Sequence, residues 1–313
     1  METIELTYPH QLNRDEMPNT VAAIGFFDGI HKGHQTVIQT AIKLAETKNM
    51  ESAVITFYPH PSVVLRNNQE VKYITPPHDK QVVLEELGVD RLYIINFNKQ
   101  LSTLTPEHFL EHFIVGLNIH HIVAGFDYTY GHKGKGNMET IKEHAKGKFD
   151  YTVIDKVILD GEKVSSTKIR SLLDIGDIEQ VNELLGRVFT TSGTVVSGFK
   201  RGRELGYPTA NIQYNNVAHL PKAGIYAVQV IIDGNLYRGM ASLGVNPTFS
   251  DERSNLSLEV YIFDFNQDIY GKEIIVEWYN FIRNEEKFDN VEALIQQMDQ
   301  DEKDIRRIFS SMQ

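Results

Sequence analysis

The sequence predicts two domains of different class: an α/β domain built on a parallel sheet, then an antiparallel β-barrel followed by one long helix. In the first half, short apolar runs alternate with longer amphipathic segments, as in βαβ units. In the second half, strand-like runs follow one another without helical segments, which indicates an antiparallel sheet. The 313 residues suit two domains of about 150 residues each. We expect the domains to span residues 1–184 and 185–313.

The predicted strands of the first domain are short continuous apolar runs, as expected for a parallel sheet buried on both faces. They lie at 21–24, 53–56, 92–95 and 122–124. Helical spacing of apolar residues occurs at 37–45, 82–87 and 109–115, and two short helical pieces at 169–173 and 178–185 close the domain. This alternation predicts βαβ units and a parallel, Rossmann-like sheet.

The second domain contains four predicted strands, at 225–232, 236–243, 256–263 and 274–282. Asp233-Gly234, between the first two, is a strong signal for a tight turn. From Val291 to Phe309 the apolar residues fall on one stripe, which predicts a long amphipathic helix. Asp289, followed three residues later by Glu292, is the predicted start of this helix.

Composition excludes several classes of protein. The chain has no cysteine, which rules out disulfides, thiolate zinc sites, iron–sulfur ligation and cysteine nucleophiles. Residues 1–184 carry 18 basic and 25 acidic side chains and residues 185–313 carry 13 and 17, so neither domain is a basic nucleic-acid-binding module. Met1–Leu12 lacks the pattern of a signal peptide, and no apolar run approaches the ~20 residues of a membrane span. We expect a cytoplasmic protein without nucleic-acid or membrane partners, and leave the oligomeric state open.

The stretch GFFDGIHKGH (25–34) lies between the first predicted strand and the first predicted helix. A phosphate at this place would meet free backbone N–H groups and the positive end of the helix dipole. His31 and His34 are three residues apart, so both rings can share one face and donate hydrogen bonds to phosphate oxygens. The stretch matches neither GxxxxGK[ST] nor GxGxxG. Glycine-rich turns with an exposed histidine pair are also common without any function.

This stretch resembles the nucleotidylyltransferase superfamily and, over its full length, the FMN adenylyltransferase module of bacterial bifunctional riboflavin kinase/FAD synthetases. Three further segments, in the family's order, are similar to that module: TFYPHP (56–61), GFDYTYG (125–131) and SSTKIR (165–170). Each also has a simpler explanation, such as a rigid turn at 58–61 or a helix cap by Ser165 or Ser166. The chain departs from the family's pattern at Phe26, Tyr128, Tyr130 and Lys168.

The resemblance implies a nucleotidylyltransferase-type first domain that joins FMN and ATP into FAD and pyrophosphate. It implies that His31, His34 and Arg170 are catalytic. The ATP-binding residues that it implies here are Gly25, Phe27, Asp28, Gly29, Gly33, Ser166, Thr167 and Lys168. Those implied for the flavin are Phe57, His60 and Asp127.

The stretch from Gly193 to Asn211 combines four glycines with three cations. Such a run is usually a solvated loop, but glycines interleaved with cations also suit a flap over phosphates. Thr209 and Asn211 supply neutral oxygen ligands of the kind that magnesium–nucleotide sites use. The stretch closely resembles the riboflavin kinase module and its GRxxG[FY]PTAN signature.

This second resemblance implies a β-barrel kinase that phosphorylates riboflavin with ATP. It implies that Glu259 is the catalytic carboxylate and that Thr209 and Asn211 hold Mg²⁺. The implied ATP-binding residues are Gly198, Arg201, Gly202, Arg203, Gly206, Pro208 and Thr209, and the implied flavin-binding residues are Asn246 and Arg283. Without the resemblance, Glu259 reads as a half-buried strand glutamate paired with Arg238 or Arg283.

The family reading therefore predicts a transferase that uses riboflavin, FMN and ATP with Mg²⁺ in both reactions. Three alternatives stay open. The chain could carry only an active riboflavin kinase, since Phe26 and Lys168 depart from the pattern of the first module, or it could bind flavin without catalysis. His108-Phe-Leu-Glu111-His112 also matches the HxxEH pattern of zinc peptidases, although we expect no tightly bound zinc.

Overall fold

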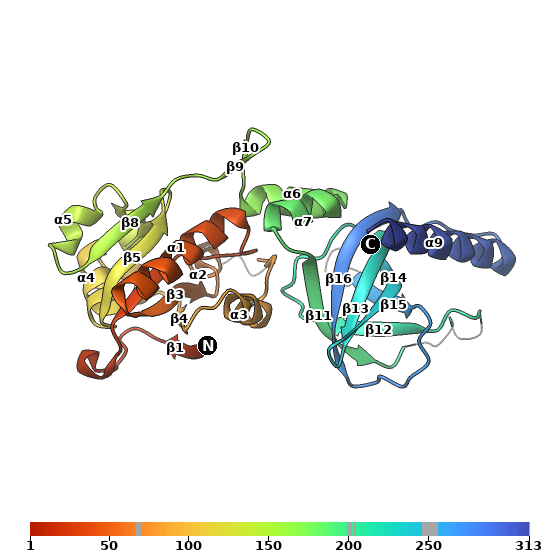
Figure 1. Ribbon diagram of the computed structural model, residues 1–313, viewed down its shortest axis with the longest axis horizontal. Coiled ribbons are helices and arrows are strands. Elements are labelled where there is room, and N and C mark those ends of the chain that lie inside the picture. Colours follow the sequence, from red (N-terminus) through yellow and green to blue (C-terminus); the bar gives the residue numbers. More distant parts are fainter. Residues whose placement is uncertain (67–70, 199–201, 203–204, 246–255, 313) are drawn as a thin grey trace. The chain divides into compact units, whose positions relative to one another are not determined.

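The structure is a computed structural model, which describes residues 1–312 except 67–70, 199–201, 203–204 and 246–255. The chain divides into two compact units, Met1–Ser166 and Thr167–Gln313 (Figure 1). The first unit is an α/β domain and the second contains the barrel, so the predicted fold class is confirmed in both halves.

A six-stranded parallel sheet forms the centre of the first unit. In spatial order its strands are β1 (Glu2–Leu6), β4 (Arg91–Asn96), β3 (Glu51–Tyr58), β2 (Thr20–Ile24), β5 (Ile119–Gly125) and β8 (Asp150–Ile154). The four predicted strands are confirmed as β2 to β5. The two edge strands, β1 and β8, were missed because they are half exposed and carry no continuous apolar run.

The helices of this unit lie on both faces of the sheet. They are α1 (Lys32–Lys48), α2 (Pro61–Arg66), α3 (Pro77–Glu86), α4 (Pro106–Leu110) and α5 (Ile141–Ala145). The single helix expected at 109–115 is instead the end of α4 continued by a π-helical turn, η3 (Glu111–Val115). Short 3₁₀ turns occur at η1 (Arg14–Glu16), η2 (Leu101–Thr103) and η4 (His132–Gly134). There are also two small antiparallel strand pairs. In one, β6 (Thr129–Tyr130) pairs with β7 (Gly136–Asn137), and in the other, β9 (Ile158–Leu159) pairs with β10 (Glu162–Lys163).

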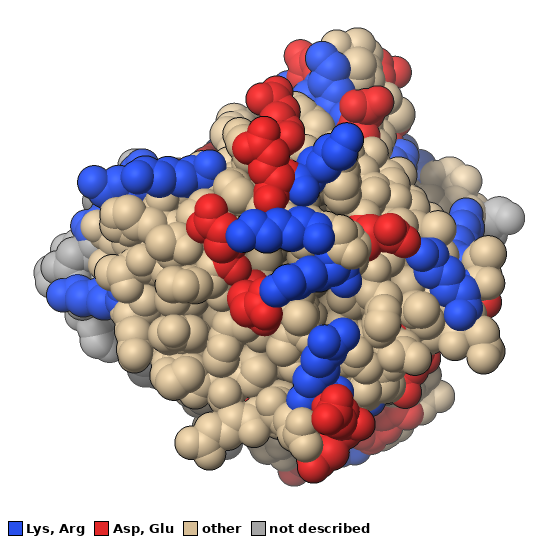
Figure 2. Space-filling model, turned by 90° about the vertical axis from the view of Figure 1, so that its left-hand side faces the viewer, with Lys and Arg blue, Asp and Glu red and all other residues tan. Residues whose placement is uncertain are grey.

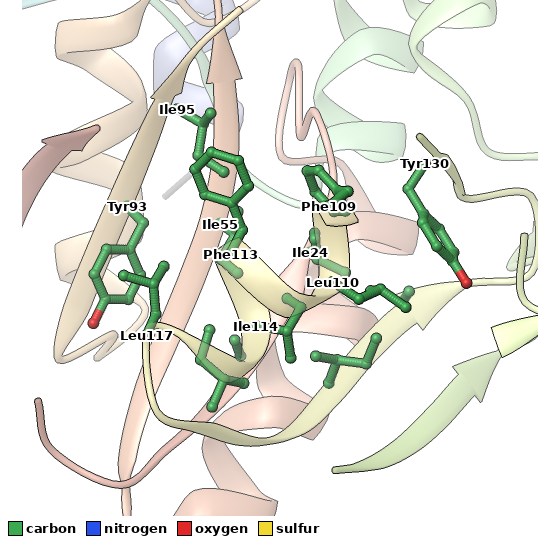
Figure 3. Packing of buried hydrophobic residues seen from close by; sticks show 14 of the residues in the cluster. Ile24, Ile55, Tyr93, Ile95, Phe109, Leu110, Phe113, Ile114, Leu117 and Tyr130 are labelled. Carbon is green, nitrogen blue, oxygen red and sulfur yellow. The ribbon is translucent and has the colours of Figure 1, made fainter. Parts of the chain in front are cut away.

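Alternate residues of each central strand pack into two separate cores. On β2, Val21 and Ala23 pack in the core that α1 and α3 cover. Its neighbours Ala22 and Ile24 pack in the opposite core, with Phe109 and Phe113 (Figure 3). Because both faces of the sheet are buried, every position of β2 is apolar apart from its first residue, and the strand appears in the sequence as one apolar run.

The strand order also locates the candidate site. The chain runs from β2 to β3 on one side of the sheet, while β5 lies on the other side of β2. The carboxyl ends of β2 and β5 therefore flank the point where the strand order reverses, which is where open α/β sheets bind ligands. The loop of residues 25–31 follows β2, and Phe126 and Asp127 follow β5.

The second unit contains a closed antiparallel barrel, and its described residues also form three helices. Around the barrel the strands are β11 (Phe189–Val196), β12 (Thr209–Tyr214), β15 (Leu256–Ile262), β14 (Asn235–Val245), β13 (Gly224–Ile232) and β16 (Glu273–Arg283), which pairs with both β13 and β11. Two helices precede it, α6 (Ser166–Ile175) and α7 (Ile178–Leu185), and α9 (Val291–Ser311) follows it. The four predicted strands correspond to β13 to β16, whereas β11 and β12 were not predicted.

The terminal helix α9 packs against one side of the barrel. Ile305 and Phe309 are buried with Ala227, Met240 and Phe263. The predicted start of the helix was wrong by one residue: Asn290 caps it, and its side chain accepts a hydrogen bond from the N–H of Ala293 at 2.8 Å. An Asn at this position satisfies one of the otherwise unpaired N–H groups of the first turn.

In the centre of the face shown in Figure 2, Lys and Arg side chains lie next to Asp and Glu side chains. Uncharged residues cover most of the left-hand side of that face. Within the described ranges, no helix is both long enough and apolar enough to cross a membrane.

Candidate active sites

The loop between β2 and α1 has an unusual backbone that packing holds in place. Phe27 and Ile30 adopt φ values of 51° and 43°, and Gly29 has a φ of 89°. Only glycine enters this region without strain, and a β-branched residue enters it at the greatest cost. Phe27 is 3% exposed and Ile30 is fully buried, so the surrounding core compensates for the strain. A strained loop that its surroundings fix so firmly is typical of a ligand site.

His31 and His34 lie together at the start of α1, as predicted. His31 is the N-cap, and its Nδ1 accepts a hydrogen bond from the N–H of His34 at 3.3 Å. The two rings stack with centroids 3.6 Å apart and planes 18° apart. Because Nδ1 of His31 accepts, the proton of the neutral ring is on Nε2, where it can be donated to a ligand. A Cβ at Gly33 would lie 3.2 Å from the His31 ring, so glycine keeps this space open.

Both imidazoles are neutral at pH 7. Burial lowers the pKa of His31 to about 4, with a smaller lowering by Lys163 and a raising by Asp127. Burial and the neighbouring His31 hold the pKa of His34 well below its ordinary value. The pair therefore offers N–H donors rather than fixed positive charges, and such donors stabilise an oxyanion as charge develops on it.

These shifts predict acid sensitivity of the first domain. The pKa of His31 is about 4 when folded against an ordinary value of 6.5, so the unfolded chain binds the extra proton between these values. The free energy of unfolding should fall as the pH drops from 7 to 4, by about 3 kcal/mol for this group. Urea unfolding followed by circular dichroism should show a weaker pH dependence in His31→Gln than in the parent. Trp278 fluorescence reports the unfolding of the barrel, and its pH dependence should be the same in His31→Gln and in the parent. If the pH dependence seen by circular dichroism were also the same in both proteins, the assignment of the acid sensitivity to His31 would be contradicted.

Asp28 and Ser166 fix the middle of the loop. Asp28 is 2% exposed, and its carboxylate accepts a hydrogen bond from the N–H of Thr75 at 3.1 Å. The hydroxyl of Ser166 donates to the carbonyl oxygen of Asp28 at 2.8 Å. Ser166 is the first residue of α6, and this hydrogen bond connects it to the loop.

The other residues predicted on α6 are placed on its first turns. Lys168 and Arg170 are half-buried, and Thr167 is exposed. All three belong to the second compact unit, so their part in the first site stays a prediction.

The residues predicted to bind flavin in the first domain have strong partners within the protein. Asp127 forms an ion pair with Lys163 at 2.6 Å, and this lysine, which the sequence reading missed, also lies 4.7 Å from the centre of the Phe126 ring. His60 donates its backbone N–H to the hydroxyl of Tyr73 at 3.0 Å. Phe57 packs partly in the core that contains Phe109 and Phe113. Their flavin role stays a prediction.

In the barrel, the predicted kinase residues lie on two paired strands. Asn211 of β12 is directly opposite Glu259 of β15. Thr209, two residues from Asn211, shares its face of the strand and donates its hydroxyl to Glu259 Oε2 at 2.9 Å. The alternative reading is confirmed in that Glu259 is a half-buried residue of a strand, but the two arginines that it names as partners have other contacts. Arg238 contacts the carbonyl oxygen of Phe309, and Arg283 binds Asp301.

Gly198 lies against this cluster. A Cβ added at Gly198 would overlap the carboxamide of Asn211, and one added at Gly202 would overlap the carbonyl oxygen of Tyr207. Gly206 has a φ of 86°. The glycines of this stretch are thus required by close approach and by backbone conformation.

We expect Gly198→Ala to displace the carboxamide of Asn211 and, in the riboflavin phosphorylation that the sequence predicts for this domain, to raise the KM for ATP by ~10-fold, as loss of a supporting contact does. The adenylyltransferase reaction should be unaffected. Ser197→Ala, at the exposed neighbouring position, serves as the control in steady-state assays of both variants. A parental KM for ATP in a folded Gly198→Ala protein would contradict this role.

Arg283 connects the end of β16 to α9. Its guanidinium donates to both carboxylate oxygens of Asp301, at 3.0 Å and 2.8 Å, and Asp301 is only 2% exposed. Such a buried bidentate pair positions α9 against the end of β16. The flavin contact predicted for Arg283 stays a prediction. Arg201, Arg203 and Asn246 lie outside the described residues. Pro208 is exposed between Tyr207 and Thr209.

Two candidate metal sites can be compared. Thr209, Asn211 and Glu259 present hard oxygen atoms on one face of the barrel, a donor set that suits Mg²⁺. In the HxxEH motif, His112 Nε2 accepts the backbone N–H of His10 at 3.0 Å, and Glu111 pairs with Lys148 at 2.5 Å. Among the residues that the structure describes, no three His, Cys, Asp or Glu side chains gather in a way that could hold a metal ion.

Comparisons with known proteins bear on both sites. Residues 13–168 match the family model of FAD synthetase, and residues 185–309 match that of riboflavin kinase. Proteins named bifunctional riboflavin kinase/FMN adenylyltransferase are similar over nearly the whole chain. That of Listeria monocytogenes is 47% identical, with all of both chains covered, and that of Bacillus subtilis is 44% identical, with 100% of this chain and 99% of the relative covered.

A solved structure has the same architecture. It is titled a macrolide-efflux protein from Streptococcus pneumoniae, is 36% identical, and superimposes with a TM-score of 0.88 over 98% of this chain and 99% of its own. Its name differs from those of the two relatives, and its likeness to this chain concerns the fold.

Proposed function

We propose a role for each candidate site in the two reactions of the bifunctional riboflavin kinase/FMN adenylyltransferases, the family to which this chain belongs. The chain is a transferase that phosphorylates riboflavin to FMN and adenylylates FMN to FAD, using ATP in both reactions. The observation that carries the assignment is that the two family models match in succession, each over a separate compact unit with its own cluster of polar residues.

In the first domain, the loop of residues 25–31 and the start of α1 bind the phosphates of ATP. A phosphate oxygen of FMN attacks the α-phosphorus, the bond to the bridging oxygen breaks, and pyrophosphate leaves. His31 and His34 donate N–H groups to the α-phosphate as its charge grows, supported by Ser166, Thr167 and Arg170. The stacked neutral rings at the N-terminus of α1 support this role.

In the barrel, Glu259 accepts the proton of the riboflavin hydroxyl that attacks the γ-phosphate, and ADP leaves. Thr209 and Asn211 hold the nucleotide together with its metal ion. The hydrogen bond from Thr209 to Glu259 Oε2 fixes the orientation of the carboxylate. Catalysis is then alignment of the two substrates plus a proton acceptor within reach of the hydroxyl.

Mg²⁺ is proposed as the metal ion of both reactions. It would lie on the oxygen atoms of Thr209 and Asn211 in the barrel, where it would offset the negative charge of the phosphates. The oxygen-only donor set supports this choice over zinc.

The boundary between residues 184 and 185 is likewise a proposal for where the two functions divide. The riboflavin kinase match begins at residue 185. By contacts alone, however, α6 and α7 group with the barrel, since Asn182 donates to the carbonyl oxygen of Trp278 at 2.8 Å.

The experiment that tests the assignment is a time course with riboflavin, ATP and Mg²⁺, in which the flavins are separated by chromatography. We expect FMN to appear first and FAD later. FMN alone would favour a chain with an active kinase only. Flavin binding without any product, in folded protein, would favour a non-catalytic flavin-binding protein.

A further inference from the structure

Lys80 is a buried lysine close to the loop of residues 25–31. No sequence motif includes this lysine. It lies on α3 and is 5% exposed. Burial lowers its pKa to about 8, while the negative charge of Asp28 raises it, so the ammonium is still charged at neutral pH. A charge in a protein interior is costly unless it is paired and hydrogen-bonded, so the contacts of this group require an explanation.

The ammonium binds one particular carbonyl group of the loop. Lys80 Nζ donates to the carbonyl oxygen of Phe26 at 2.8 Å and contacts Thr56 Oγ1 at 3.4 Å. The hydroxyl of Thr56 donates to the same carbonyl oxygen at 2.9 Å. The ammonium also lies 4.8 Å from the centre of the Phe26 ring. Helix α3, the end of β3 and the loop therefore meet at the carbonyl of Phe26.

These contacts determine the direction of the next peptide N–H. In a trans peptide the C=O and N–H groups point in opposite directions. Because the carbonyl of Phe26 points toward Lys80, the N–H of Phe27 points away from it. Phe27 then enters its left-handed conformation, and Asp28, Gly29 and Ile30 lead into the N-cap, His31. The course of the whole loop begins at this fixed peptide.

We propose that Lys80 is a positioning residue of the adenylyl-transfer site. Its ammonium fixes the peptide between Phe26 and Phe27 and places a positive charge behind the loop that binds the phosphates of ATP. It does so without contacting the nucleotide. Phe57, Tyr73 and Ile94 line the small pocket beside it, so water screens the charge poorly, and the carboxylate of Asp28 offsets part of it. This inference rests on the proposed function of the first domain.

Lys80→Met removes the charge and both contacts while keeping most of the volume. We expect kcat/KM for ATP in the adenylylation of FMN to fall 10- to 100-fold, the range found for residues that orient ligand-binding groups. The KM for FMN should stay within about twofold, because the flavin is bound by other residues, and a general loss of structure would not produce this split. Riboflavin phosphorylation by the same chain should be unchanged.

Three further variants separate charge from hydrogen bonding. Lys80→Gln keeps a donor without the charge and should behave like Lys80→Met; it also replaces that variant should Lys80→Met not fold. Thr56→Val removes the other donor to the carbonyl of Phe26 and keeps the charge. It should therefore lower kcat/KM for ATP less than Lys80→Met or Lys80→Gln does. Lys43→Met removes a charge from an exposed position of α1 and should be parental in both reactions.

Several results would overturn the proposal. One is a folded Lys80→Met protein with parental kcat/KM for ATP, and another is an equal rise of KM for both substrates. An effect of Thr56→Val as large as that of Lys80→Met would remove the role of the charge. If the parent forms no FAD, the proposed function fails instead, and calorimetric titration with ATP then decides the inference. Two binding events in the parent, of which one is lost or at least tenfold weaker in Lys80→Met, support it, and identical isotherms overturn it.

Discussion

His31→Ala is expected to reduce the formation of FAD by ~10²-fold or more, while the same chain continues to form FMN at the parental rate. The structure gives this expectation a specific cause. His31 accepts the N–H of His34 through Nδ1, so its remaining N–H, on Nε2, is a donor of fixed direction. Removing a preorganised donor to a developing oxyanion costs about 3 kcal/mol of transition-state stabilisation.

The substitution also removes the N-cap of α1 and one half of the stacked pair. Some loss of stability is therefore expected, about 1 kcal/mol for the cap. His31→Asn restores a cap without the imidazole and should recover the stability but not the activity. His108→Ala changes an exposed histidine of the HxxEH motif and should leave both reactions intact. FAD synthesis at the parental rate in folded His31→Ala would exclude a catalytic role for this ring.

The sequence predicted those parts of the fold in which one local pattern dominates. The central strands β2 to β5 are buried on both faces, so each appears as an apolar run, and α9 shows an amphipathic stripe. The edge strand β1 has only one fully buried residue, Leu6, and gave no such signal. Strands β11 and β12 were missed because polar residues, together with Gly193 in β11, interrupt their apolar pattern.

In the candidate sites, the sequence predicted contacts between residues that are close along the chain. It missed contacts between residues that are far apart in the sequence and that only the folded structure brings together. His31 and His34 are three residues apart, and their stacking follows from helical geometry. Lys80 is 54 residues from Phe26 and lies in a helix with several charged residues, where a lysine normally faces water. The pairing of Arg283 with Asp301 likewise depends on the docking of α9 against β16.

For the barrel we expect the opposite pattern to that of His31→Ala: the formation of FMN is reduced and the adenylylation of FMN is kept. Glu259→Gln should reduce the phosphorylation of riboflavin by 10²- to 10⁴-fold, the typical contribution of a general base. The adenylylation of FMN supplied directly should be unchanged. Glutamine keeps the shape of the side chain, and its amide oxygen can still accept the hydroxyl of Thr209, so the loss would report the proton acceptor rather than the packing.

The two substitutions together test the division of labour more strictly than either alone. With riboflavin as the substrate, Glu259→Gln should form FMN 10²- to 10⁴-fold more slowly and FAD no faster, because the second reaction is short of its substrate. Added FMN should restore the formation of FAD. No added flavin should rescue His31→Ala. Glu273→Gln changes an exposed glutamate of β16 and serves as the matched control. Parental phosphorylation by Glu259→Gln would leave the carboxylate with an orienting role only, and kinase catalysis would then rest on the alignment of the nucleotide by Thr209 and Asn211.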